Sequence, residues 1–356
     1  MPAATTARRT SRFWLYAPFV LLALLAAGWS GLWVVARGKV EQHLEAGIAR
    51  EANAGRNWTC RDRSVGGYPF RIEVRCAGVT LVSSRWGDEV RLEAGPTVAV
   101  AQASTPGHLI LQVAGPLTAT LPAGRNADLA WSRFEASLRL TTTGFERLSV
   151  VLNDPVATLR TPDQADGSLR SESMRSALFE AHLRPNQQGF ASQQAFDVAL
   201  STKGTVMALL DGLLGDAAPG DLDVQATVSQ ALAFRRGFNH DALESWRAAG
   251  GGVEITKLGL TKGTARLDAS GRIGLDDAHR PAGQLDAAVA GIERIAGIRV
   301  GGGLTAGLGA LLGGRSGAQK SNAAAGLTPL PPVVLREGRV YLGPLRLPLQ
   351  PLRPLY

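Results

Sequence analysis

An apolar stretch close to the start of the chain constrains the fold most strongly. Phe13–Ala36 runs for 24 residues without one charged side chain. At a rise of about 1.5 Å per residue a helix of this length measures about 36 Å, more than the about 30 Å of a hydrocarbon core. The stretch therefore predicts a membrane anchor over 13–36. Aromatic residues suited to the headgroup level lie near both its ends (Trp14, Tyr16, Trp29, Trp33).

A cleaved signal peptide is the alternative for this stretch, with a small-residue site ending at Ala36. The apolar core of a signal peptide is usually only about 7–15 residues long, which favours an uncleaved anchor.

Much of the positive net charge of the chain comes from basic residues that flank the same stretch. The formal charge is +8, and five of these charges come from Arg8, Arg9, Arg12, Arg37 and Lys39. The remainder is unremarkable and gives nucleic-acid binding little support. Three arginines and no acid precede the stretch, whereas Glu41 and Glu45 dilute the basic residues beyond it. Because positive residues stay on the cytoplasmic side, we expect a cytoplasmic tail over 1–12 and a translocated body.

The body that follows shows the side-chain period of β-strands. Residues 37–52 continue a helical pattern, after which the apolar residues of Phe70–Cys76 alternate with charged ones. Similar alternation recurs near 90–93, 117–121, 138–140, 222–225 and 265–268, and Gly-Pro pairs such as Gly95-Pro96 and Gly115-Pro116 separate the segments. These features predict a mostly β, antiparallel body over 37–299.

Two short helices are expected to interrupt the strands. Val206–Leu214 has apolar residues at helical spacing, and Asp241–Ala249 ends at three glycines. Asp241 and Glu244 are three residues apart, as in a capping box. Both helices are interpreted as lids packed on a sheet.

The two cysteines, Cys60 and Cys76, lie symmetrically about Tyr68, with the turn sequence Gly66–Pro69 between them. If the flanking strands form a hairpin, the two side chains face one another. A disulfide closing a loop of about 15 residues stabilises by about 3 kcal/mol in the chain-entropy model and requires an oxidising compartment. Two unpaired buried thiols are the alternative.

The C-terminal part begins with a segment rich in glycine and alanine. Residues 300–328 predict a flexible linker, although the uncharged run 301–314 also has the small-xxx-small spacing of helices that pack closely in lipid. Residues 329–356 predict a hairpin and a proline-rich extended tail.

No arrangement of residues in the sequence indicates catalysis. The five histidines are scattered without metal-ligand spacing, and there is no nucleophile elbow, dinucleotide fingerprint or P-loop. We therefore expect a protein that is not an enzyme and has no cofactor and no metal site. The arginines of the alternating segments have acids nearby (Arg71, Arg75, Arg91, Arg139, Arg266), which favours a salt-bridged solvent face over a nucleic-acid surface.

Several stretches together resemble one bacterial family. The longest, Gly66–Val79, reads GGYPFRIEVRCAGV and follows the apolar stretch and the segment Trp58–Cys60. With Ala181–Pro185, Trp246–Gly252 and Leu335–Pro344 it is similar to the family called domain of unknown function 2125 (DUF2125). The resemblance covers most of the chain and implies no particular activity.

Ile255–Val289 bears a looser resemblance to AsmA-like envelope proteins, in a series of strands and glycine turns. Those proteins are anchored in the bacterial inner membrane and project folded-over sheets whose apolar inner face is thought to carry lipid. The resemblance implies a single-pass inner-membrane protein with a periplasmic body, built as a folded-over sheet or open sandwich. The chain is far shorter than the long members, so it is not expected to bridge two membranes alone.

The functional hypothesis is a non-enzymatic groove that binds lipid or another apolar envelope molecule. Its expected lining is the inward residues of the alternating segments: Ile72, Val74, Leu92, Leu138, Leu140, Val224 and Leu267. A closed core built from the same residues would show the same periodicity. The alternative function is a scaffold that docks an envelope protein partner through sheet edges or the C-terminal tail.

Overall fold

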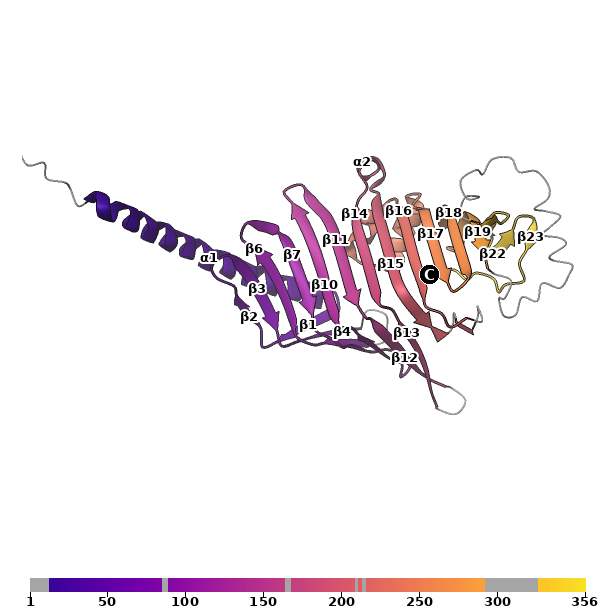
Figure 1. The fold of residues 1–356 in the computed structure, drawn as a ribbon, viewed down its shortest axis with the longest axis horizontal. Coiled ribbons are helices and arrows are strands. Elements are labelled where there is room, and N and C mark those ends of the chain that lie inside the picture. The colour runs from indigo at the N-terminus through magenta and orange to yellow at the C-terminus, as the bar shows by residue number, and fades with distance from the viewer. Residues whose placement is uncertain (1–12, 85–88, 164–167, 209–210, 213–215, 292–325) are drawn as a thin grey trace, which may run out of the picture.

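The structure, a computed structural model, describes residues 13–84, 89–163, 168–208, 211–212, 216–291 and 326–356. It begins with α1 (Phe13–Asn53), a single helix of 41 residues (Figure 1). Of the helices described, α1 is long and apolar enough to cross a membrane, and it fits a single-pass anchor. The predicted span and its predicted helical continuation thus form one helix.

A folded antiparallel sheet makes up the body (Figure 1), and all pairings between its described strands are antiparallel. One part, which we call the short leaf, consists of β1 (Arg56–Arg61), β4 (Gly78–Ser83), β5 (Val90–Ala94), β8 (Leu117–Thr120), β9 (Asn126–Ala130), β12 (Val156–Pro162) and β13 (Leu169–Arg175).

The other part, the long leaf, begins with β2 (Ser64–Gly66), β3 (Arg71–Cys76), β6 (Thr97–Gln102), β7 (Thr105–Val113), β10 (Arg133–Thr141), β11 (Gly144–Asn153), β14 (Leu178–Pro185) and β15 (Phe196–Met207). It continues with β16 (Gly220–Val228), β17 (Val253–Lys262), β18 (Ala265–Leu275) and β19 (Pro281–Ala290). The edge is formed by β20 (Thr328–Pro329), β21 (Val333–Arg336), β22 (Arg339–Leu342) and β23 (Leu345–Arg346). β21 and β22 pair as a hairpin, where the sequence predicts one.

Short connectors join the strands of one leaf to those of the other. β3 reaches β4 through Ala77 alone, and β5 reaches β6 through Gly95 and Pro96. The strand register sets seven connectors side by side: 62–63, 77, 95–96, 114–116, 131–132, 154–155 and 176–177. We call this row the crease. β15 ends the row, because it pairs with β14 in the long leaf and β13 in the short leaf.

Backbone hydrogen bonds continue through the crease. The N–H of Ala114 donates to the carbonyl of Pro96 at 2.8 Å, and the N–H of Ala177 donates to the carbonyl of Lys203 at 2.8 Å. The Gly-Pro pairs at 95–96 and 115–116 do separate strands, as predicted, but they do so as bends that carry the chain from one leaf to the other and not as turns that reverse it. Glycine and proline favour both turns and bends, so only the pairing of distant strands distinguishes the two.

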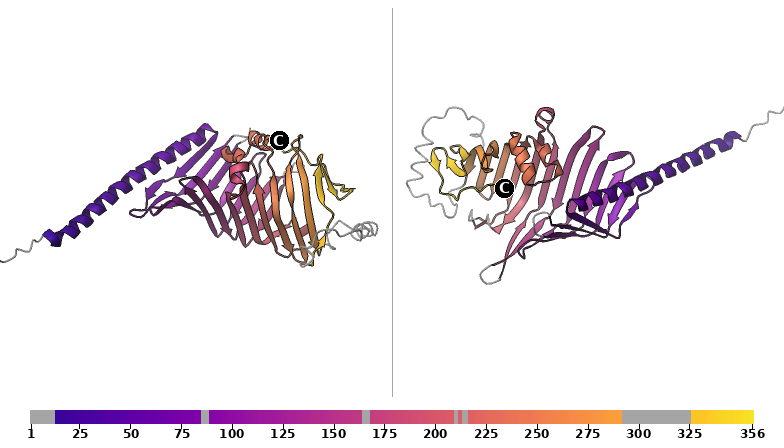
Figure 2. Two further views of the ribbon diagram at one scale, coloured as in Figure 1. Left: turned by 90° about the horizontal axis from the view of Figure 1, so that it is seen from above. Right: turned by 180° about the vertical axis from the view of Figure 1, so that it is seen from behind.

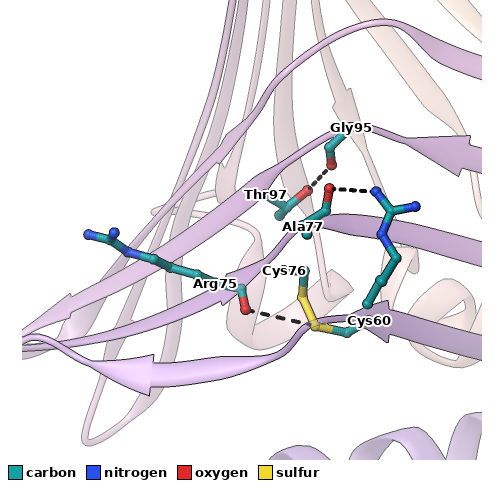
Figure 3. The surroundings of a disulfide bond; sticks show 7 residues. Cys60, Arg75, Cys76, Ala77, Gly95 and Thr97 are labelled. Carbon is teal, nitrogen blue, oxygen red and sulfur yellow. Dashed lines mark hydrogen bonds between the residues drawn. A yellow bond between two sulfur atoms is a disulfide. The ribbon is translucent and has the colours of Figure 1, made fainter.

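The predicted disulfide between Cys60 and Cys76 is confirmed, with a Cα–Cα distance of 5.3 Å. The predicted hairpin is present too, because β1 and β2 run antiparallel to β4 and β3, but Cys60 lies opposite Val79 and not opposite Cys76. The disulfide instead joins the two leaves across the crease, and Figure 3 shows it beside Ala77 and Gly95. It links the leaves at the end of the crease where the chain enters the body.

Short helices lie outside the sheet: α2 (Phe190–Gln193), η1 (Ala231–Arg236) and α4 (His240–Ala248). α4 matches the predicted helix over 241–249, but the predicted capping by Asp241 is wrong. Asn239, in an extended conformation, caps the helix by accepting a hydrogen bond from the N–H of Ala242 at 2.8 Å. In the other predicted helix Val206 belongs to β15, and 209–210 and 213–215 lie outside the described residues. Most of the predicted linker, including 301–314, also lies outside them.

The alternating charges form salt bridges on one face of the sheet, as predicted for Arg71, Arg75 and Arg91. Glu73 binds the first two, with N–O distances of 2.5 Å to each, and Arg91 lies 2.5 Å from Glu93. These pairs leave the opposite face of the same strands to apolar side chains.

Substitution of Gly95 by alanine tests the crease. A Cβ at this position would lie 2.7 Å from the carbonyl oxygen of Ala114 on the neighbouring strand. We expect Gly95→Ala to lower the free energy of unfolding by about 1–3 kcal/mol, as overpacking does, measured by urea titration of the full chain in detergent. Gly66→Ala is the matched control, because its Cβ meets nothing within 4 Å. Equal stability of the two variants would contradict the close approach.

Candidate functional site: an apolar trough

The short leaf has one apolar and one polar face. Residues directly opposite on paired strands point to the same face of a sheet. The register aligns an apolar row of Val79, Ala94, Leu117, Leu129, Ala157 and Met174. The adjacent row on the other face is Thr80, Glu93, Thr118, Asp128, Thr158 and Ser173. This pattern leaves one face of the leaf to solvent and directs the other inward.

The long leaf continues the apolar surface. One of its rows is Val74, Ala99, Leu111, Ala136, Val150, Ala181, Leu200, Val224, Leu258 and Ala269. A parallel row begins with Ile72, Ala101, Leu109, Leu138, Leu148, Leu183, Val198 and Ala226. These rows extend well beyond the strands that also take part in the short leaf.

The two apolar faces meet on the concave side of the fold. The disulfide joins Cys60, in the row of Val79, to Cys76 at the end of β3. Helix α1 contacts both leaves, since its Trp33 shares a cavity with Ile72 of the long leaf, and Trp58 of the short leaf has its indole nitrogen 3.4 Å from Glu51. Figure 2 shows α1 and α4 on the same side of the long leaf. We call the space between the leaves the trough.

A cavity of about 510 Å³ lies along the short-leaf side of the trough. Its wall includes Leu117, Leu129, Leu159, Met174 and Met207. The volume is within the about 300–1,000 Å³ typical of ligand sites, and an apolar lining with few polar groups suits an apolar ligand.

The trough is open. None of the large side chains described in the structure is buried to below 2% exposure, and Leu159 is 37% exposed. A closed core would bury such residues, so the sheet is folded over without closing on itself.

Four of the seven predicted lining residues, Ile72, Val74, Leu138 and Val224, belong to the inward rows of the long leaf. Ile72 and Val74 lie on β3, Leu92 on β5, Leu138 and Leu140 on β10, Val224 on β16 and Leu267 on β18. Leu140 is 43% exposed and the other six are half-buried. Ile72 lines the cavity between α1 and the long leaf; contact of the seven with a ligand stays a prediction.

Sequence reasoning missed most of the short-leaf wall. Leu117 belongs to an alternating segment that was recognised, but Leu129, Leu159 and Met174 were not included. Alternation at 127–129 and 157–159 was available as a signal. Met207 could not have been found, because it reaches the short leaf only through the pairing of β15 with β13.

At the far end of the long leaf the C-terminal residue holds α4. The Tyr356 hydroxyl donates to Glu244 Oε2 at 2.8 Å, and its ring stacks on His279 with centroids 4.4 Å apart. Arg247 also binds Glu244, through Nη2 at 2.8 Å. These hydrogen bonds, first from Arg247 and then from Tyr356, lower the pKa of Glu244 to about 2. The proline-rich tail, predicted as merely extended, therefore docks back onto the body.

Polar side chains also line a cavity outside the trough. A second cavity of about 470 Å³ is lined on the polar side of the long leaf by residues such as His182, Arg184 and Asp197. Two of its charged residues form an ion pair, with Arg184 Nε 3.1 Å from Asp197 Oδ2. Within the described ranges, no group of three or more His, Cys, Asp or Glu side chains is placed to hold a metal ion.

A comparison with protein families identifies the chain's relatives. The model of a family described as uncharacterized proteins conserved in bacteria, DUF2125, matches residues 33–350. The chain belongs to this family. The DUF2125 match covers the second half of α1 and both leaves, so all strands of the trough lie within it, and it ends before Tyr356. No curated protein and no solved structure matches the chain, and the looser AsmA-like resemblance is not shown.

Substitution of Tyr356 by phenylalanine tests the docking of the tail. The lowered pKa means that the ionised Glu244 contributes stability above its unfolded value of 4.5 and loses it as the pH falls through about 2. Without the Tyr356 hydroxyl, the pKa of Glu244 should rise. It should stay below 4.5, because Arg247 still donates its hydrogen bond to the carboxylate. We expect this in carboxyl ¹³C NMR titration, with Glu244→Gln assigning the signal. Tyr341→Phe, on β22, should leave the titration unchanged; an unchanged Tyr356→Phe curve would contradict the contact.

Proposed function

We propose that this DUF2125 protein binds lipid or another apolar envelope molecule in the trough between its leaves. The observation that carries the proposal is the open, mainly apolar cavity along the short leaf, whose lining includes leucines and methionines together with polar residues such as Asp128 and Glu172. Exposure of apolar surface to water is unfavourable by about 25 cal/mol per Å². An apolar ligand that covers this surface would therefore bind favourably.

The openness of the sheet favours this function over the scaffold alternative. A scaffold closed on its own core would bury its large inward side chains, whereas here most of those along the short-leaf wall, such as Leu117 and Leu159, are half-buried or exposed. We further propose that the protein is not an enzyme and does not bind nucleic acid. This is supported by the paired charges on the polar face, where Arg160 binds Asp128 and Lys257 binds Asp223.

We also propose that α1 anchors the protein in the bacterial inner membrane, with residues 1–12 in the cytoplasm and the body in the periplasm. The Cys60–Cys76 disulfide supports an oxidising compartment for the body. Retention of the anchor is supported by Trp29, whose indole N–H donates to the carbonyl of Pro69 at 2.8 Å, since cleavage after Ala36 would remove this contact.

External protease tests this topology. Added to spheroplasts, it should degrade the body and leave only a fragment of the size of the anchor and tail. Survival of the full chain until the inner membrane is permeabilised would place the body in the cytoplasm instead.

Paired substitutions on the short leaf test ligand binding. Leu117 faces the trough and Thr118, its neighbour, faces outward between Glu93 and Asp128. We expect native mass spectrometry of the full chain to detect copurified phospholipid, and Leu117→Lys to reduce it severalfold because a charge in the apolar wall is unfavourable. Thr118→Lys adds the same charge beside two acids and should retain the lipid.

A second variant separates loss of binding from loss of folding. Ala157→Phe adds an apolar side chain to the wall of the same cavity and should reduce lipid without adding charge. Circular dichroism confirms that each variant is folded. Absence of lipid from the unsubstituted chain, or equal lipid in all four proteins, would contradict the proposed function.

A further inference from the structure

The turn between β2 and β3 is bound to the anchor helix. Trp29 donates its indole N–H to the carbonyl of Pro69 at 2.8 Å, and Trp33 donates to the carbonyl of Arg71 at 3.1 Å. The hydroxyls of Ser30 and Tyr68 are 2.8 Å apart. Three consecutive contacts along one side of α1 therefore fix the height of this turn relative to the anchor.

The part of α1 that binds the turn lies within the membrane. Trp29 precedes Arg37, the first charged residue after the span, by eight residues. This spacing corresponds to about 12 Å along a helix, whereas each headgroup region is about 5–8 Å thick. If Arg37 lies at the aqueous boundary, the carbonyl of Pro69 reaches the edge of the hydrocarbon core.

The composition and exposure of the turn suit that position. Val65–Phe70 contains no charged residue. The side chain of Phe70 is 73% exposed and that of Tyr68 is 55% exposed. Because the indole N–H groups of Trp29 and Trp33 bind the body, these tryptophans do not use them for lipid headgroups. Phe70 instead presents exposed aromatic surface at the interface, where aromatic rings are favoured, and Tyr68 packs its ring against Trp33 with centroids 5.5 Å apart.

The trough begins at the same place. A cavity of about 210 Å³ is lined by Leu32 and Trp33 of α1 and by Ile72, Ala101 and Pro106 of the long leaf. Ile72 and Ala101 are also the first members of one inward row of the trough. An apolar surface thus continues from the anchor helix onto the concave face of the sheet.

We infer that the β2–β3 turn inserts into the membrane that α1 spans, and that the trough opens onto this bilayer beside Phe70. The ligand is then the acyl chain of a membrane lipid, which enters between α1 and β3 without crossing water. The choice of ligand rests on the proposed function, whereas the insertion of the turn rests only on the contacts with α1.

Spin labelling tests the insertion. A nitroxide is attached to Phe70→Cys in the full chain, reconstituted in vesicles of phosphatidylcholine and phosphatidylglycerol, while Cys60 and Cys76 remain protected as the disulfide. Phe238→Cys is the matched control, because Phe238 is 68% exposed but lies next to α4 at the far side of the body. The label at 70 should collide severalfold more with oxygen than with a water-soluble nickel complex, and the label at 238 should show the reverse. Equal nickel accessibility at both sites would overturn the insertion.

A filling substitution tests the entrance. Ala101→Phe places a ring in the small cavity, whereas Val100→Phe places it on the opposite face of the same strand. In folded protein, Ala101→Phe should reduce copurified phospholipid severalfold and Val100→Phe should not. Undiminished lipid in Ala101→Phe would overturn the membrane entrance while leaving trough binding intact. Lipid absent even from the unsubstituted chain would overturn the proposed function, and the label at 70 would still report insertion.

Discussion

Seven neighbouring strands bend at the same register, and their backbone groups stay hydrogen-bonded through the bend. A buried N–H or carbonyl without a partner is unfavourable, so a sheet cannot fold sharply unless its strands bend together. Each connector of one to three residues must therefore match its neighbours, as Ala114 matches Pro96. The disulfide holds the row at its first end, where few strands support it.

The remaining features depend on this common bend. Folding one sheet along the crease brings its two apolar faces together on the concave side and leaves the Thr- and Arg-bearing faces outside. Helix α1 lies at the end of the trough where the chain enters the body. Helix α4, which is held by Tyr356, lies at the opposite end. The same helix that spans the membrane thus also sets the position of the trough, through Trp29 and Trp33.

Local patterns in the sequence predicted the strands well, because the alternation of Phe70–Cys76 is visible within a few residues. They could not distinguish Gly95-Pro96 as a bend from a turn, since the difference lies in which distant strands pair. The cysteines were paired correctly and lie in one hairpin as predicted, but the bend that places Cys60 and Cys76 in different leaves has no local signal. Similarly, the wall at Leu129 and Met174 emerges only once the order of strands in the short leaf is known.

Because of the crease, the length and the width of the trough depend on different features of the chain. Strands cross its axis, so its length is counted in strands and does not depend on how long each strand is. Seven bent strands and β15 at about 4.8 Å spacing extend about 34 Å, close to the thickness of a hydrocarbon core. A chain that gained one more bent pair would lengthen the trough by about 10 Å without altering its cross-section. The width of the ligand and its length are thus specified by separate parts of the sequence.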